Sequence, residues 1–298
     1  MKIDVSSAYM SRNILQKMKR GEEILDWEIV QYEESAGIQF LKQHCSRYGG
    51  LELNQEVLKQ ILKHPNQCGV FGEAVILGME KLDNIDLLLN VNLYELEDEI
   101  TQKVQNYSLV DVSTLDITIY LLYGIRGTAI VLPENALAID LCDDSLFVNG
   151  RLESSRIIDV LAHEYHHICF DQYVKEHGTR DKTIADSILN GLISEGMAYE
   201  FFTPWLIKAG GHESIWDKNY IGIEENIVSL EKVLKEEMDK GQLEKIENEL
   251  FGSGLLGYTM GYHMIHTIHK KFGKNAVLDL MNTYNIFEVY RSLYVQQK

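Results

Sequence analysis

Apolar residues recur three and four positions apart through most of the first hundred residues of the chain. This spacing places them on one face of an α-helix. Breaks rich in glycine or proline, such as Gly49-Gly50 and His64-Pro65-Asn66, separate the segments. The helical segments that the pattern predicts are residues 8–20, 22–45, 52–63, 70–82 and 84–106. We therefore expect a helical region over residues 1–108, and we find no functional motif in it.

A β-type pattern follows this helical region. Residues 116–123 are β-branched and aromatic, and two further apolar runs occupy 128–132 and 136–141. Two glycines and a Pro-Glu-Asn sequence lie between the runs, as turns require. The pattern predicts two or three strands in a small antiparallel or mixed sheet. Together with the helices, it gives an α+β fold that is predominantly helical.

The next helical run is apolar almost all round and contains the sequence His163-Glu164-Tyr165-His166-His167. Ser154 and Ser155 offer an N-cap just upstream of it. A helix that is apolar on every side is buried, and buried histidine or glutamate is costly unless it is paired or bound to metal. The run therefore predicts a buried helix with functional polar residues.

The spacing H-E-x-x-H suits zinc. His163 and His167 are four residues apart, so they share one helix face at roughly 5–6 Å between Cβ atoms. Two imidazoles there can occupy two corners of a tetrahedral zinc site, and Glu164 can polarise a water on the metal. His166 competes as a ligand, but the i, i+4 pair is the better-attested geometry, so we interpret His166 as a packing or supporting residue.

A catalytic zinc site usually has three protein ligands. Glu195 is a lone acid in a second apolar helical run, residues 183–208. A polar turn at 175–182 precedes this run, and an antiparallel return would bring Glu195 beside the two histidines. The alternative is an acid at the solvated edge of the helix, which its apolar neighbours on both sides disfavour.

H-E-x-x-H followed by Ser194-Glu195-Gly196-Met197-Ala198 on the next helix resembles the gluzincin metallopeptidases. It is similar in particular to a family of predicted bacterial zinc-dependent proteases with a Ser-Glu-Gly-Met/Leu-Ala motif. The resemblance covers about residues 115–273. It implies a zincin-like fold, one Zn²⁺ per chain held by His163, His167 and Glu195, and Glu164 as general base.

Two features depart from the gluzincin pattern. The gap between the second histidine and the glutamate is longer than in thermolysin-like members. Tyr199 stands where those enzymes have an aspartate that orients a ligand histidine, and Asp171 or Glu200 could take that role. These departures concern the residues that support the ligands rather than the ligands themselves.

The resemblance also implies two elements of substrate binding. One is an edge strand that pairs with an extended peptide, for which residues 135–141 are the candidate; a plain core strand is the alternative. The other is an oxyanion donor after the third ligand, for which Tyr258, Tyr262 and His263 are candidates, with core packing as the alternative. Gly257 and Gly261 would be costly inside a helix, so they suggest a close approach to something. We interpret two further histidines in the same run, His266 and His269, as surface or packing residues.

Composition narrows the choice of partners and compartment. The formal charge of -17 argues against nucleic acid and anionic membranes, and much of it lies in residues 224–249, which read as exposed helices. No apolar run is long enough for a membrane span, the first residues lack a signal-peptide pattern, and the four scattered cysteines suit reduced thiols. We expect a cytoplasmic protein acting on a peptide or protein substrate, with its oligomeric state open.

The leading hypothesis is a zinc metallopeptidase with a helical cap (1–108) and a catalytic part (109–298). Two alternatives remain at this point. The same fold could serve for binding or regulation without catalysis, although that role does not need Glu164. A zinc hydrolase acting on non-peptide amides would show the same pentapeptide.

Overall fold

The computed structural model describes residues 1–49, 52–123, 128–132, 135–177, 183–208, 213–236, 239–252 and 254–295. The chain forms two compact units. One comprises Met1–Ile100 and Thr114–Glu164, and the other Thr101–Ser113 and Tyr165–Lys298, so the division falls inside helix α8 (Ser154–His177). The α+β class with predominant helix is confirmed. The division at residue 108 into a helical cap and a catalytic part stays a prediction.

The first unit contains a four-stranded mixed sheet with the strand order β1-β2-β4-β3. Its strands are β1 (Lys2–Asp4), β2 (Thr118–Leu122), β3 (Ala129–Leu132) and β4 (Ala136–Asp140). β2 runs parallel to both β1 and β4, while β3 is antiparallel to β4. Of the two or three strands predicted, the structure has all three, and β1 was not predicted.

The expectation that residues 135–141 form an edge strand is wrong. β4 pairs with β2 on one side and with β3 on the other, so its backbone groups are used on both edges. Four of its five residues, Leu137–Asp140, are buried, as in a central strand covered on both faces. Among the described strands, β1 and β3 lie at the ends of the sheet.

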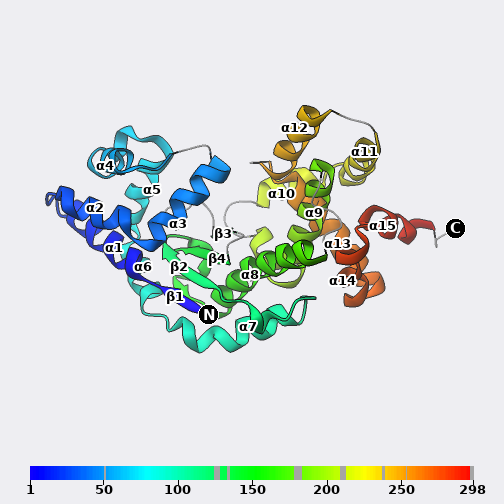
Figure 1. Cartoon of the computed structure of the whole chain (residues 1–298), viewed down its shortest axis with the longest axis horizontal. Coiled ribbons are helices and arrows are strands. Elements are labelled where there is room, and N and C mark those ends of the chain that lie inside the picture. Colours follow the sequence, from blue (N-terminus) through cyan, green and yellow to red (C-terminus); the bar gives the residue numbers. More distant parts are fainter. Residues whose placement is uncertain are drawn as a thin grey trace. The chain divides into compact units, whose positions relative to one another are not determined.

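The predicted N-terminal helices are present, with more breaks than the pattern showed. Helices α1 and α3 both pack against β2, and Figure 1 shows them beside the strands. The predicted segment 22–45 divides at Ser35, whose extended backbone (ψ 146°) interrupts the helix. The helices are α1 (Ser6–Lys19), α2 (Asp26–Glu34), α3 (Ala36–His44), α4 (Gln55–Lys63), α5 (Gly69–Glu80), α6 (Leu82–Leu89) and α7 (Glu97–Gln105).

Helix α9 (Ile184–Phe201) follows α8 along the chain. Thr183 caps it: its hydroxyl accepts from the N–H of Asp186, whose carboxylate accepts in return from the Thr183 N–H. The predicted helix to residue 208 ends early, because Pro204 disfavours helical backbone in the residue before it.

The elements described after α9 in the second unit are helices. Its helices are α10 (Glu213–Tyr220), α11 (Ile223–Lys235), α12 (Lys240–Phe251), α13 (Leu256–Phe272), α14 (Lys274–Thr283) and α15 (Ile286–Val295). The acidic stretch 224–249 forms the helices expected, with i, i+4 pairs such as Lys240–Glu244 at 3.5 Å. Among the described residues, no helix combines the length and apolar character that a membrane crossing requires.

Helices α9 and α13 approach until their backbones touch. A Cβ added at Gly196 would lie 2.5 Å from the carbonyl oxygen of Gly261. A Cβ added at Gly261 would lie 2.4 Å from the carbonyl oxygen of Leu192. Since no other residue fits either position, the close approach inferred from the glycine at 261 is confirmed, and its partner is the helix that carries Glu195.

Candidate metal centre

Helix α8 buries the pentapeptide as its apolar flanks predict. Leu161, Ala162 and Ile168 are almost entirely buried, and His163 is only 7% exposed. Glu164 and His167 are partly buried, so they lie where the buried side of the helix meets more open surroundings.

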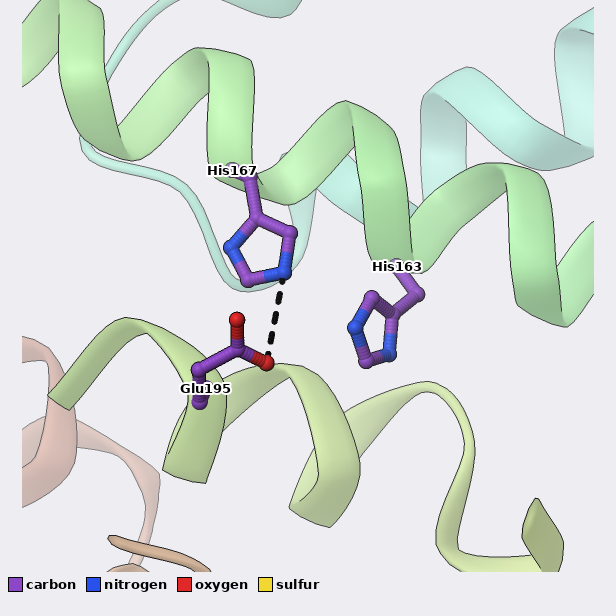
Figure 2. Close-up of side chains that lie close together, drawn as sticks. All are labelled: His163, His167 and Glu195. Atoms are coloured by element: carbon purple, nitrogen blue, oxygen red, sulfur yellow. Dashed lines mark ion pairs between the residues drawn. The ribbon is translucent and has the colours of Figure 1, made fainter. Parts of the chain in front are cut away.

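The structure brings His163, His167 and Glu195 together. One candidate ligand atom from each residue lies within 4.8 Å of those of the other two. Figure 2 shows both imidazoles leaving consecutive turns of α8 toward the carboxylate on α9, with His167 Nε2 at 3.6 Å from Glu195 Oε2. Within the described ranges, no other three histidine, cysteine or acidic side chains form a group with this spacing.

Ser194 fixes the ring of His167. Its Oγ lies 2.7 Å from His167 Nδ1. With Nδ1 engaged by this hydroxyl, Nε2 is the nitrogen that faces Glu195 and is left to bind a metal. Ser194 is itself only 8% exposed, so the hydrogen bond is shielded from solvent. Sequence reasoning missed this contact, although the serine was already part of the Ser-Glu-Gly motif.

The electrostatics of the group suit a bound cation. Burial lowers the pKa of His163 to about 3, which keeps its imidazole neutral and its lone pair available. Burial also raises the pKa of Glu195, and His167 partly opposes that rise. The neutral imidazole of His163, the imidazole of His167 and the desolvated carboxylate of Glu195 form a donor set of the kind that zinc binds, so these residues fit the predicted metal.

His166 lies outside this group. It is fully buried, and its ring sits 5.4 Å from that of Phe202 and 6.0 Å from that of Phe170. Its ring is also 5.8 Å from that of His167. These contacts agree with a packing residue behind the candidate ligand.

The sequence left Asp171 and Glu200 as candidates to replace the missing aspartate. The carboxylate of Glu200 instead engages two histidines of α13, His266 Nδ1 at 2.8 Å and His269 Nδ1 at 2.7 Å. Neither of these hydrogen bonds was predicted, because both histidines were interpreted from the sequence as surface or packing residues. For His167, the structure supplies Ser194 in place of an acid.

The three candidate oxyanion donors have different surroundings. Tyr258 meets the ring of Tyr199, one turn after Glu195, edge to face at 6.3 Å. Tyr262, one turn further along α13, stacks on His266 at 5.3 Å. His263 Nε2 lies 2.8 Å from the hydroxyl of Tyr290. The role of each in catalysis stays a prediction, and the bond to Tyr290 makes His263 the least available.

Comparison with known proteins places most of the chain in one family. A family model described as "Putative zinc dependent peptidase (DUF5700)" matches residues 91–298, which is more than half of the chain. The match includes both motifs and the helices that carry them. No curated protein and no solved structure matches the chain.

Proposed function

The chain belongs to the DUF5700 family of zinc-dependent peptidases, and we propose that it hydrolyses peptide bonds at a gluzincin-type centre formed by His163, His167 and Glu195. The observation that carries the proposal is the convergence of these three side chains from two helices. The family description supports zinc and peptidase chemistry, and the ligand set and the gluzincin assignment are our own inference.

A zinc ion in such a donor set supplies a Lewis acid that polarises a carbonyl and lowers the pKa of water. We assign the proton transfers to Glu164. Its carboxylate takes the proton from the attacking water and gives it to the leaving amine nitrogen. Its position fits this role, since it follows the buried ligand His163 directly in α8 and remains partly exposed.

An oxyanion donor must keep its proton at neutral pH. Burial, with a further contribution from the charge of Glu200, raises the pKa of Tyr262, so its phenol stays protonated. Tyr258 lies one turn earlier on α13 and contacts Tyr199, which is one turn from Glu195. We therefore favour Tyr258 and Tyr262 over His263 as the donors.

The substrate we propose is an extended peptide. β4 lies in the interior of the sheet, and its antiparallel neighbour β3 is one of the two edge strands. A peptide can add to such an edge through main-chain hydrogen bonds, which do not depend on the side chains of the peptide. We propose β3 for this role in place of the strand expected from the sequence.

The function is tested by digesting a peptide library with wild-type protein, Glu164→Gln and the control Glu176→Gln, after measuring zinc in each. Glu176 is an exposed acid of the same helix, hydrogen-bonded to Gln172 at 2.7 Å. We expect about one zinc per chain in all three and loss of cleavage only in Glu164→Gln.

Cleavage by Glu164→Gln at the wild-type rate would exclude the general-base role. Zinc-loaded wild-type protein that cleaves no peptide would favour a binding protein or a hydrolase of other amides. Absence of zinc after supplementation would overturn the metal centre itself.

A further inference from the structure

Glu200 forms a second polar cluster on the helix that carries Glu195. Its Oε2 lies 2.8 Å from His266 Nδ1, and its Oε1 lies 2.7 Å from His269 Nδ1. The carboxylate is about 10% exposed, while the two imidazole side chains are about a third exposed. We call Glu200, His266 and His269 the Glu200 cluster.

Both oxygens of Glu200 are occupied by donors from one helix. A carboxylate only accepts, so each imidazole donates its Nδ1–H, and both bonds are charge-assisted. Neighbouring rings restrict the two imidazoles. Tyr262 stacks on His266 with an interplanar angle of 28°, and Phe201 meets His269 edge to face at 4.9 Å. The bonds are therefore directional and hold the carboxylate in one orientation.

The negative charge of Glu200 contributes to the raised pKa values of two nearby tyrosines, Tyr262 and Tyr220. Burial is the main cause of the raised pKa of Tyr262 and of Tyr220, which rises to about 12, and the charge of Glu200 adds to both. Glu200 is thus a buried charge inside the second unit. Its two histidine bonds offset a desolvation cost that an unpaired carboxylate would bear in full.

The cluster lies beside the closest contact of α9 and α13. Gly196 touches Gly261, and Glu200 is one turn beyond Gly196 on the same helix. The glycine contacts set the distance between the helices. Glu200 adds a directional polar attachment one turn away, which resists rotation of α9 about its own axis. Glu195 is five residues before Glu200, or about 7.5 Å along the helix axis.

We propose that Glu200 is a positioning residue for the metal centre: through His266 and His269 it fixes the rotation of α9 and so directs the carboxylate of Glu195 toward His167. The proposal rests on the zinc site proposed above. Its own content is that removing the Glu200 bonds weakens zinc binding even though Glu200 contacts no metal.

The test compares the zinc affinity and the thermal stability of full-length variants, with zinc as the ligand and a chelator as competitor. Glu200→Gln keeps the size of the side chain but replaces one acceptor with a donor. The matched control is Glu247→Gln, because Glu247 accepts from Ser187 Oγ at 2.5 Å and ties the other end of α9 to α12. We expect about tenfold weaker zinc binding in Glu200→Gln and wild-type zinc affinity in Glu247→Gln. The two variants should lose similar amounts of melting temperature relative to wild type.

Two double variants keep the test decisive if Glu200→Gln folds poorly. Asparagine retains a donor near the position of Nδ1, so His266→Asn with His269→Asn should bind zinc nearly as wild type does. His266→Leu with His269→Leu removes both donors and should match Glu200→Gln. Wild-type zinc affinity in Glu200→Gln or the leucine pair, or equal weakening in the asparagine pair, would overturn the proposal. A wild type that binds no zinc would instead overturn the metal centre.

Discussion

Ser194 Oγ lies 2.7 Å from His167 Nδ1, and the residue that follows Ser194 is the candidate ligand Glu195. Helix α9 therefore carries both a candidate ligand and the group that orients another candidate ligand. Partners of this kind fix the tautomer and rotation of a metal-binding histidine, and losing one typically costs 10–100-fold in affinity or activity.

We predict that Ser194→Ala weakens zinc binding by about tenfold or more, while Ser194→Thr, which keeps the hydroxyl, loses less. Chelator competition measures both variants. Ser187→Ala is the control, since Ser187 lies on the same helix but bonds to Glu247. Equal affinities in wild type and Ser194→Ala would show that His167 is oriented by packing alone.

Metal removal should destabilise the fold. His163 is buried with a pKa near 3, and Glu195 is a desolvated carboxylate, so the metal-free protein retains polar groups in a poorly solvated site. Zinc at a hundredfold excess over its dissociation constant should add about 2.7 kcal/mol to the free energy of unfolding. Thermal melts with chelator and after zinc is restored measure this change. His163→Asn with His167→Asn should melt at one temperature under both conditions.

Substitution at the α9–α13 crossing should be costly. A methyl group at Gly196 would lie 2.5 Å from a backbone oxygen of α13, which no rotamer change can relieve. We predict that Gly196→Ala lowers the free energy of unfolding by about 1–3 kcal/mol. The control is Gly241→Ala in α12, where the nearest atom to the added Cβ is Asp239 Oδ1 at 3.4 Å. Alanine there should stabilise the helix by about 0.5–1 kcal/mol, and denaturant titration compares the two. Equal behaviour of both variants would contradict backbone contact at the crossing.

Acid should weaken one contact of the first unit. Lys17 Nζ lies 2.6 Å from Glu28 Oε1, and this hydrogen bond is the main reason that the pKa of Glu28 is lowered below 4.5. The unfolded state then takes up the proton first as the pH falls. The stabilisation is therefore complete above the ordinary glutamate range and is lost as the pH falls through the folded pKa.

Glu28→Gln should accordingly cost about 1 kcal/mol at pH 7 and little at pH 3. Melting temperatures at the two pH values measure the difference, with Glu34→Gln, an exposed position in the same helix, as control. A deficit in Glu28→Gln that is the same at both pH values would mean that the contact stabilises by packing rather than by charge.

The sequence predicted best the features that lie within a single element. The apolar flanks of the pentapeptide predicted a buried helix, and every residue of 157–170 is buried or partly buried. Glu195 was expected near His163 and His167 because one helical return suffices to place it there. The strands from residue 116 onward were visible in their β-branched composition.

Features formed by distant segments were not visible in the same way. β1 has three residues, too few for a pattern, and pairs with β2, which starts at residue 118. The interior position of β4 depends on that strand order, which the composition of β4 does not specify. The bonds of Glu200 to His266 and His269 were missed for the same reason. Helical spacing shows which residues of one helix share a face, but not which residues of another helix they contact.

The contact between Gly196 and Gly261 also bears on how such a protein can diverge. Main chain meets main chain there, so the spacing of α9 and α13 does not depend on the identity of the aromatic residues nearby. If Tyr258 and Tyr262 contact the substrate as proposed, their exchange would alter its surroundings without moving the backbone beneath Glu195. Substrate preference and the position of the candidate ligand would then depend on different atoms of the same two helices.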